Sequence, residues 1–255
     1  MWNARHPDSL ISSNESHEIW SILHSHLKKS CNKETCWLKQ QFVAGKLNEN
    51  NILNESFAPV TPVEWKKNPN EWLSSVDIIN VMNQYEKAYK CFEFIGPSPI
   101  DYDTKKLYGE TVWPELSSFY LKHQLKRGKN KIGIIFNTDP HYKGGSHWVS
   151  LFINVKKKLI FYYDSVGSPI PSNIMKFVNK VREQGQHITP KKVDFIFDEN
   201  KNVEHQKKDG QCGMYSLYFI IQMLKDKVTP LYLKTHRITD EQMIQFRKIY
   251  FNEEL

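Results

Sequence analysis

Residues 212–224 read Cys-Gly-Met-Tyr-Ser-Leu-Tyr-Phe-Ile-Ile-Gln-Met-Leu, a run that is apolar on nearly every face of a helix. A helix that is hydrophobic all round belongs inside a domain, with other elements packed around it. The run starts at Cys212, with Gly210 and Gly213 close on either side, so a loop meets the helix at a thiol. The stretch therefore predicts a buried central helix whose first residue is a cysteine.

Strands and helices are mixed around this run. Apolar runs predict strands at 131–136, 147–155, 159–164 and 193–197. The second and third of these flank three lysines, which is typical of a β-hairpin. Helical spacing predicts helices over 174–181 and after the capping-box residues Thr239–Gln242, whereas prolines and aspartates predict a loop over 96–103. Because strands and helices do not alternate strictly, the predicted fold class is α+β.

The first 65 residues differ from the rest of the chain. They are rich in serine, asparagine and lysine, with one helical stretch at 18–23, and the prolines within 57–63 favour extended chain. From Glu71, apolar residues recur every three or four positions and predict a helix with one apolar face: Trp72, Val76, Ile79, Met82 and Tyr85. We therefore predict a mainly helical N-terminal arm over 1–65 and a core domain over 66–255.

The arm carries large apolar side chains at Trp20, Trp37, Phe42 and Trp65, which are too many for a wholly disordered tail. We therefore expect the arm to pack on the core. There it either shapes a binding groove or only shields apolar surface.

The composition is that of a globular protein. The 255 residues are 40% hydrophobic and 25% charged, and no apolar run approaches the roughly 20 residues of a membrane span. The N-terminal residues lack the apolar segment of a signal peptide, so the four cysteines predict unpaired thiols in a reducing compartment. The net charge of +7 is spread over small lysine clusters, the densest at 122–131, which are typical of solvated loops. They give only weak support to nucleic-acid binding.

Cys31 and Cys36, with His24 and His26 nearby, have the thiol spacing of some zinc sites. The histidines precede the cysteines too closely for a standard zinc finger. We therefore expect no metal and no cofactor, and unpaired thiols at both cysteines.

The predicted position of Cys212 suits a nucleophile. A thiol attacks only as thiolate, and a helix N-terminus supplies partial positive charge that favours the thiolate. It also presents free backbone N–H groups that can bind an oxyanion. A lone cysteine near glycine is more often a buried structural residue, so the interpretation depends on partners elsewhere in the chain.

Three such partners stand upstream. His147 follows a glycine-rich loop and begins a predicted strand, and Asp164 ends the next strand. In an antiparallel hairpin these two ends lie side by side, so the carboxylate can orient the imidazole. Gln206, six residues before Cys212, either supplies an amide N–H to the oxyanion or is an exposed loop residue. Together a thiol, an imidazole, a carboxylate and an amide are the groups that a cysteine hydrolase uses.

The same residues carry a resemblance to a known family. Gly-Ser-His-Trp at 145–148, Tyr-Asp-Ser at 163–165 and Gln-x5-Cys-Gly at 206–213 resemble the ubiquitin-like-protein-specific cysteine proteases, the SUMO-protease and adenain clan. Residues 212–217 and 237–247 are similar to viral polyprotein-processing members, as is Glu34-Thr35-Cys36 in the arm. The segment 237–247 carries no catalytic residue of that family, which makes coincidence a poor explanation.

The resemblance implies a mixed sheet around the central helix, and it implies a role for each site residue. These are the nucleophile Cys212, the general base and acid His147, the orienting Asp164 and the oxyanion donor Gln206. Trp148 either lines a tunnel for a Gly-Gly substrate or belongs to the core. Two positions depart from the family pattern. A viral member has an amide at the position of Asp164, and many SUMO proteases have aspartate where this chain has Gln211, which we do not treat as catalytic.

The resemblance further implies a cysteine endopeptidase that processes viral structural polyproteins at Gly-Gly-x sites during virion maturation, in the host cytoplasm and the virion. One alternative is an isopeptidase that removes SUMO or ubiquitin from host proteins. Another is a catalytically idle, basic virion-binding protein.

Overall fold

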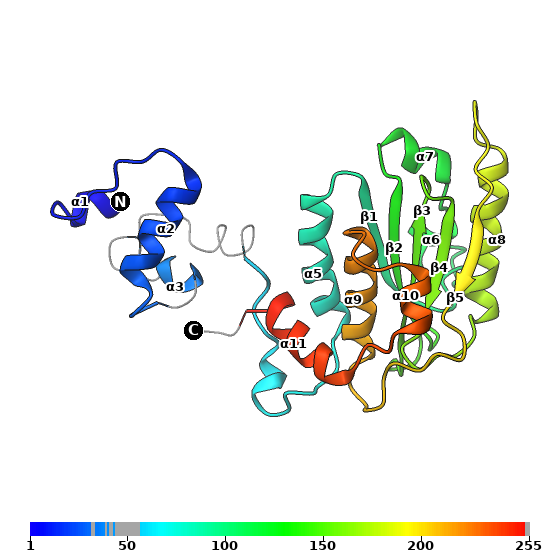
Figure 1. Cartoon of the computed structure of the whole chain (residues 1–255). Helices are drawn as coiled ribbons and strands as arrows, with labels where there is room; N and C mark the ends of the chain where they lie inside the picture. Colours follow the sequence, from blue (N-terminus) through cyan, green and yellow to red (C-terminus); the bar gives the residue numbers. More distant parts are fainter. Residues whose placement is uncertain (32–33, 39, 41–42, 44–56, 253–255) are drawn as a thin grey trace. The chain divides into compact units, whose positions relative to one another are not determined.

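The structure of the chain is a computed structural model, and it describes residues 1–31, 34–38, 40, 43 and 57–252. These fall into two compact units, one formed by Met1–Val60 with Asn252–Leu255 and the other by Thr61–Phe251 (Figure 1). Phe42, one of the apolar residues noted in the arm, lies outside the described residues. Trp65 packs within the second unit, edge-on to Phe251.

The Thr61–Phe251 unit is built on a five-stranded mixed sheet in which each strand lies beside its neighbour in sequence. The strands are β1 Phe92–Pro99, β2 Lys131–Asn137, β3 Trp148–Asn154, β4 Leu159–Tyr163 and β5 Ile196–Glu199. The first and last pairs are parallel, and β2, β3 and β4 are antiparallel. The predicted hairpin of β3 and β4 is therefore confirmed, as is the α+β fold class.

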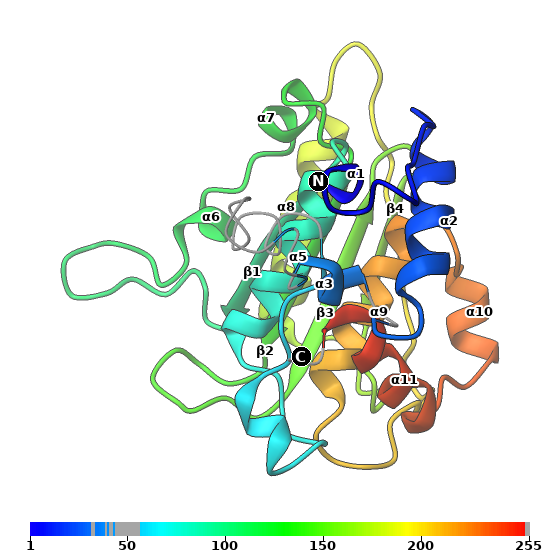
Figure 2. The same cartoon turned by 90° about the vertical axis from the view of Figure 1, so that its left-hand side faces the viewer.

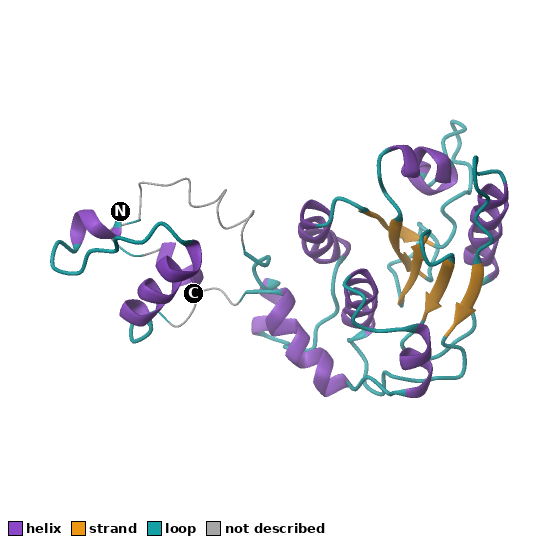
Figure 3. Cartoon of the chain, turned by 45° about the horizontal axis from the view of Figure 1, so that its top comes forward, coloured by secondary structure: helices purple, strands orange, loops and turns teal. Residues whose placement is uncertain are grey.

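Helices cover both faces of the sheet (Figure 3). Helices α5 (Ser75–Ala88) and α9 (Cys212–Leu224) pack on one face, and α8 (Ser172–Gln186) packs on the other. Every residue of α9 except Gln222 is buried, which confirms the predicted central helix. The shorter helices of this unit are η1 Val63–Lys66, α6 Pro114–Ser117, α7 Leu121–Lys126, α10 Pro230–Thr235 and α11 Asp240–Tyr250.

Three sequence predictions need correction. The loop predicted over 96–103 is wrong in its first part, because Gly96–Pro99 continue β1; a proline is tolerated there because β1 is an edge strand. The strand predicted over 193–197 begins three residues later, at Ile196. The helix predicted from Glu71 begins at Ser75, because Ser74 caps it, and its buried face is formed by Ile78, Val81 and Met82.

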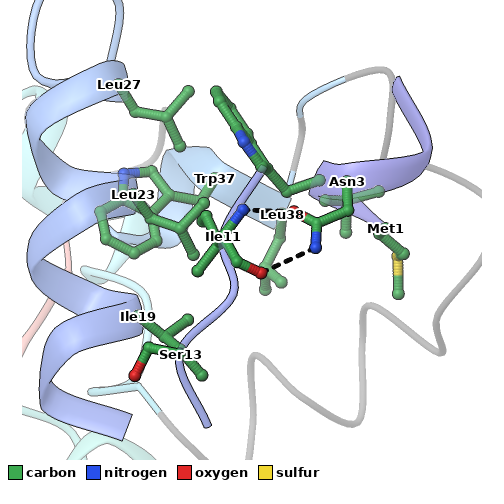
Figure 4. Close-up of a pocket in the computed structure, with 11 residues that line it drawn as sticks. Met1, Asn3, Ile11, Ser13, Ile19, Leu23, Leu27, Trp37 and Leu38 are labelled. Atoms are coloured by element: carbon green, nitrogen blue, oxygen red, sulfur yellow. Dashed lines mark hydrogen bonds between the residues drawn. The ribbon is translucent and has the colours of Figure 1, made fainter. Parts of the chain in front are cut away.

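The Met1–Val60 unit contains helices α1 (Trp2–Arg5), α2 (Ser16–Leu27) and α3 (Glu34–Leu38). Residues of all three helices line an open apolar pocket of about 420 Å³, where Asn3 exchanges two hydrogen bonds with the backbone of Ile11 (Figure 4). All residues that line this pocket lie between Met1 and Val43, so none of the predicted catalytic residues contributes to it.

Cys31 and Cys36 form a disulfide, so the prediction of unpaired thiols at these two positions is wrong. Their Cα atoms lie 5.5 Å apart, a separation that suits a disulfide. Within the described residues, no group of three or more metal-ligating side chains comes together. The described helices also include none with the length and apolar character needed to span a bilayer.

Candidate active site

The sheet brings the predicted base and its orienting carboxylate to one edge. His147 immediately precedes β3 and Asp164 immediately follows β4, and these strands are antiparallel, with Ser150 opposite Tyr163. The start of β3 and the end of β4 therefore meet. Helix α9 packs on β3, and its first residue is Cys212 (Figure 2).

His147 and Asp164 are joined by a short hydrogen bond. The Nε2 atom of His147 lies 2.7 Å from Oδ1 of Asp164, which leaves Nδ1 for the thiol. The same carboxylate oxygen accepts the backbone N–H of Val166 at 3.0 Å. Asp164 is almost fully buried, so these bonds replace its lost hydration and fix the plane of the imidazole.

The environment of His147 favours its protonated form. Burial alone lowers the pKa of the imidazole, but hydrogen bonds to Asp164 and to Cys212 outweigh it and raise the pKa to about 10. The ring therefore carries its proton at neutral pH and faces the sulfur of Cys212. A protonated imidazole beside a cysteine stabilises the thiolate, which is the attacking species.

Cys212 occupies the position that the sequence predicts, at the first residue of α9, and is buried. The helix N-terminus adds partial positive charge and backbone N–H groups with no partner inside the helix. The next residue is a tightly packed glycine, because a Cβ on Gly213 would lie 3.0 Å from Cβ of Leu73 and 3.3 Å from the ring of Trp148, so that these side chains would have to shift. The tight packing holds the start of the helix in place.

Gln206 is buried and oriented by its neighbours. Its Oε1 atom accepts the hydroxyl of Ser165 at 2.7 Å, and its Nε2 atom donates to the carbonyl of Lys208 at 2.7 Å. Two backbone N–H groups, of His205 and Gln206, also donate to the carbonyl of Ser165. The amide nitrogen therefore points along the loop that leads to Cys212, and its second hydrogen suits an oxyanion donor.

Comparisons with known proteins agree with this geometry. The model of the Ulp1 protease family, C-terminal catalytic domain, matches residues 119–255. A protein of Acanthamoeba polyphaga mimivirus that carries the name of a thiol protease is 31% identical over 223 residues, covering 87% of this chain and 69% of its own length. This chain belongs to the Ulp1 protease family. It is accordingly a cysteine protease, and its relatives include viral thiol proteases.

Other members of the Ulp1 family extend the match to most of the chain. The SUMO-1 cysteine protease of African swine fever virus is 26% identical over 255 residues, covering 96% of this chain and 91% of its own length. The crystal structure of an African swine fever virus protease superposes with a TM-score of 0.70 at 23% identity, covering 96% and 94% of the two chains. The SUMO protease Ulp1 with its catalytic cysteine oxidised to a sulfenic acid gives a TM-score of 0.51 at 19% identity, covering 78% and 84%. These two structures show the shared fold.

Two polar residues of the Ulp1-family site escaped the sequence prediction. Asn200, which is fully buried, accepts the backbone N–H of Asp164 at 2.9 Å and donates to its carbonyl at 2.7 Å. Ser165 fixes the amide of Gln206. Both lie in polar segments whose pattern resembles an ordinary turn, so no local signal marks them.

Two tryptophans border the nucleophile. Trp148 is 7% exposed and donates its indole N–H to the carbonyl of Leu73 at 3.0 Å, so it packs in the core beside Cys212. Trp72 is 40% exposed and lies outside α5, contrary to the predicted helix. Its Cδ1 atom lies 3.5 Å from the position that a Cβ would take at Gly210, two residues before the thiol. Trp72 is thus the more accessible aromatic at this site.

Proposed function

We propose that this protein is a cysteine endopeptidase that cleaves viral structural polyproteins at Gly-Gly-x sites during virion maturation. The observation that carries the proposal is the imidazole of His147, which is hydrogen-bonded to Asp164 at 2.7 Å and to Cys212. That arrangement supports acyl transfer through a thiolate. The similarity to viral proteases supports the choice of a viral protein as substrate.

In the proposed reaction the thiolate of Cys212 attacks the carbonyl carbon of the scissile bond. The backbone N–H of Cys212 and the amide of Gln206 stabilise the oxyanion. The imidazolium of His147 gives its proton to the leaving amine, and the neutral ring then removes a proton from the water that hydrolyses the acyl-enzyme. Asp164 holds the ring and stabilises its charge in both steps.

We propose that the enzyme prefers glycine before the cleaved bond. We propose that the substrate backbone passes beside Trp72 and Trp148, where a side chain would collide with the rings. Only glycine fits a passage that closes on the backbone.

Removal of SUMO from conjugates is the second candidate, because the African swine fever virus relative carries the name of a SUMO-1 cysteine protease. The chemistry at the carbonyl is the same, so the two functions differ only in the protein beyond the Gly-Gly pair. We place the protein in the host cytoplasm and the virion, where a polyprotein would be processed.

Nucleic-acid binding has less support than either. Arg127 and Lys129 of the densest basic cluster pair with Glu93, and Lys131 pairs with Asp226 at 2.7 Å. These ion pairs neutralise part of the charge that a phosphate backbone would require.

The proposal is tested with the full-length protein on peptides of the form Gly-Gly-x, matched Gly-Ala-x and Ala-Gly-x peptides, and a SUMO conjugate. We expect cleavage after Gly-Gly only, unaffected by EDTA and abolished by iodoacetamide. Cys212→Ser is the control for contaminating proteases. Cleavage of the SUMO conjugate without cleavage of the peptides would favour deconjugation, and activity that EDTA removes would contradict the thiolate mechanism.

A further inference from the structure

A buried arginine reaches the catalytic loop from the far end of the chain. Arg247 belongs to α11, which packs against α9, and only 4% of it is exposed (Figure 1). Its guanidinium makes four hydrogen bonds of 2.9 to 3.1 Å, to Oε1 of Gln211 and to the carbonyls of Pro69, Glu71 and Gly210. One face of the group lies 4.1 Å from the ring centre of Trp65.

The charge of Arg247 is not neutralised by these partners. Each of the four acceptors is a carbonyl or amide oxygen, and none is a carboxylate. Burial lowers the pKa of Arg247 to about 10, so the group still carries its charge at neutral pH. Placing a positive charge in the interior is unfavourable unless a negative charge in the neighbourhood offsets it.

The four acceptors come from two short segments that meet beside the thiol. Gly210 and Gln211 immediately precede Cys212, whereas Pro69 and Glu71 lead to Trp72. Arg247 therefore ties the nucleophile loop to the segment that carries the accessible tryptophan. The amide of Gln211 completes the tie, since its Nε2 atom donates to Oδ1 of Asn70 at 3.2 Å.

The charged groups around Cys212 do not balance the negative charge of a thiolate unless this arginine is included. The carboxylate of Asp164 balances the imidazolium of His147, so that pair by itself leaves a thiolate uncompensated. The charged groups that act on Arg247 are Glu71 and Cys212. Glu71 acts more strongly but is only half-buried, so water screens its carboxylate, whereas Cys212 is buried and its sulfur is the partner within the interior.

We propose that Arg247 is a positioning residue that holds the loop before Cys212 in its catalytic conformation and stabilises the thiolate with its buried charge. The inference rests on the proposed use of Cys212 as the nucleophile. It gives a role to the chain's last helix, whose segment 237–247 carries none of the residues predicted to be catalytic. A planar fork with five donors can serve two segments at once, which a lysine cannot.

The test uses the full-length protein and needs no substrate for its first readout. The rate at which iodoacetamide alkylates Cys212 is followed against pH, with the Cys212 peptide identified by mass spectrometry because Cys91 is also a free thiol. Arg247→Met should raise the pH of half-maximal alkylation by about one unit, which corresponds to a tenfold weaker preference for the thiolate. Arg247→Lys, which keeps the charge, should leave that pH within a few tenths of a unit. Arg182→Met, an exposed arginine of α8, is the matched control.

The second readout is peptide cleavage. Both Arg247 variants should lower kcat by about tenfold or more, because the loop that carries the nucleophile loses its anchor. A folded Arg247→Met protein with the alkylation profile of the wild type would overturn the inference.

If Arg247→Met does not fold, Gln211→Glu replaces it. That change keeps the acceptor for Arg247 but places a carboxylate against it, and an unchanged alkylation profile would again overturn the inference. A shifted profile in a protein that cleaves no Gly-Gly-x peptide would sink the proposed substrate and leave the role of Arg247 standing.

Discussion

At the level of single residues, the buried carboxylate of Asp164 sets the orientation of His147, the partner of Cys212. Oδ1 of Asp164 binds both His147 and the N–H of Val166, and Asn200 holds the backbone of Asp164 from two sides. The imidazole is therefore oriented by a buried group that its own hydrogen bonds hold in place.

Three substitutions at this site should differ in severity. Cys212→Ser should lower kcat by a thousandfold or more, roughly, because a hydroxyl is a poor nucleophile beside a base tuned to a thiol. His147→Ala should be nearly as severe. Asp164→Asn should cost less, on the order of tenfold to a hundredfold, since the amide still holds the ring but stabilises the imidazolium less. Steady-state peptide hydrolysis measures all three, and a Cys212→Ser protein as active as the wild type would refute the assignment.

The raised pKa of His147 predicts a specific pH dependence of stability. Its folded-state value of about 10 exceeds the ordinary 6.5, so the folded protein holds the proton more tightly than the unfolded chain does. This contribution is complete below pH 6.5 and is lost as the pH rises through 10. Urea unfolding gives the free energy of unfolding of the wild type and of His147→Asn. The difference between the two should therefore become smaller as the pH rises from 6.5 to 10. A difference that stays constant across that range would contradict the prediction.

A residue of the candidate site could be predicted from the sequence where the pattern of its immediate neighbours marked it. Three of the residues, Cys212, His147 and Asp164, lie at the ends of apolar runs. Such a run indicates a helix or strand and also where that element begins or ends. Asn200 and Arg247 act across 36 residues or more of chain. Their roles depend on which segments the fold brings together, and spacing in the sequence does not contain that information.

At the level of elements, the boundary of α5 decides the environment of Trp72. Ser74 accepts the N–H of Asp77 at 3.3 Å, and the Asp77 carboxylate accepts the N–H of Ser74 at 2.8 Å, a reciprocal capping box. The helix therefore starts after Trp72 and leaves that side chain on the loop beside Gly210. Apolar spacing alone extended the helix too far. Trp72 falls in phase with Val76 and Ile79, but the serine cap starts the helical geometry only after it.

Removing the cap should therefore destabilise the protein. Ser74→Ala should lower the free energy of unfolding by about 1 kcal/mol, because the N–H of Asp77 at the start of α5 loses its partner. Denaturant unfolding measures the change, and Ser75→Ala, one residue inside the helix, is the control. Equal stabilities for the two variants would show that the cap contributes nothing.

Helix α9 and the hairpin of β3 and β4 were predicted correctly because burial leaves long unbroken apolar runs. Strand β1 was missed for the opposite reason. It lies at the sheet edge, contains Gly96 and Pro97, and is irregular between Ile95 and Ser98, so its pattern resembles a loop.

At the scale of the whole molecule, the two units raise the question of what the N-terminal one contributes. Its tryptophans Trp20 and Trp37 pack with each other and with His24, so the described part of the unit has apolar contacts of its own. Additions to a self-sufficient catalytic domain commonly carry recognition. We expect this one to engage the protein substrate.

A chain that begins at Thr61 tests that expectation. It should cleave a short Gly-Gly-x peptide at a rate close to the full-length value, but a folded polyprotein at least about tenfold more slowly, because only the large substrate reaches the missing unit. Circular dichroism establishes that the shortened chain is folded. Full activity on both substrates would sink the idea.

The start of α9 at Cys212 has a thermodynamic consequence for anything that binds there. The helix is buried along almost its whole length, so its central amides should exchange with solvent only when the entire domain opens. A ligand attached to the sulfur is therefore linked to the folding equilibrium of the core and not to a flexible surface loop. Covalent inhibitors of this enzyme should slow amide exchange throughout α9 and β3, and their binding energy should appear as increased resistance to proteolysis.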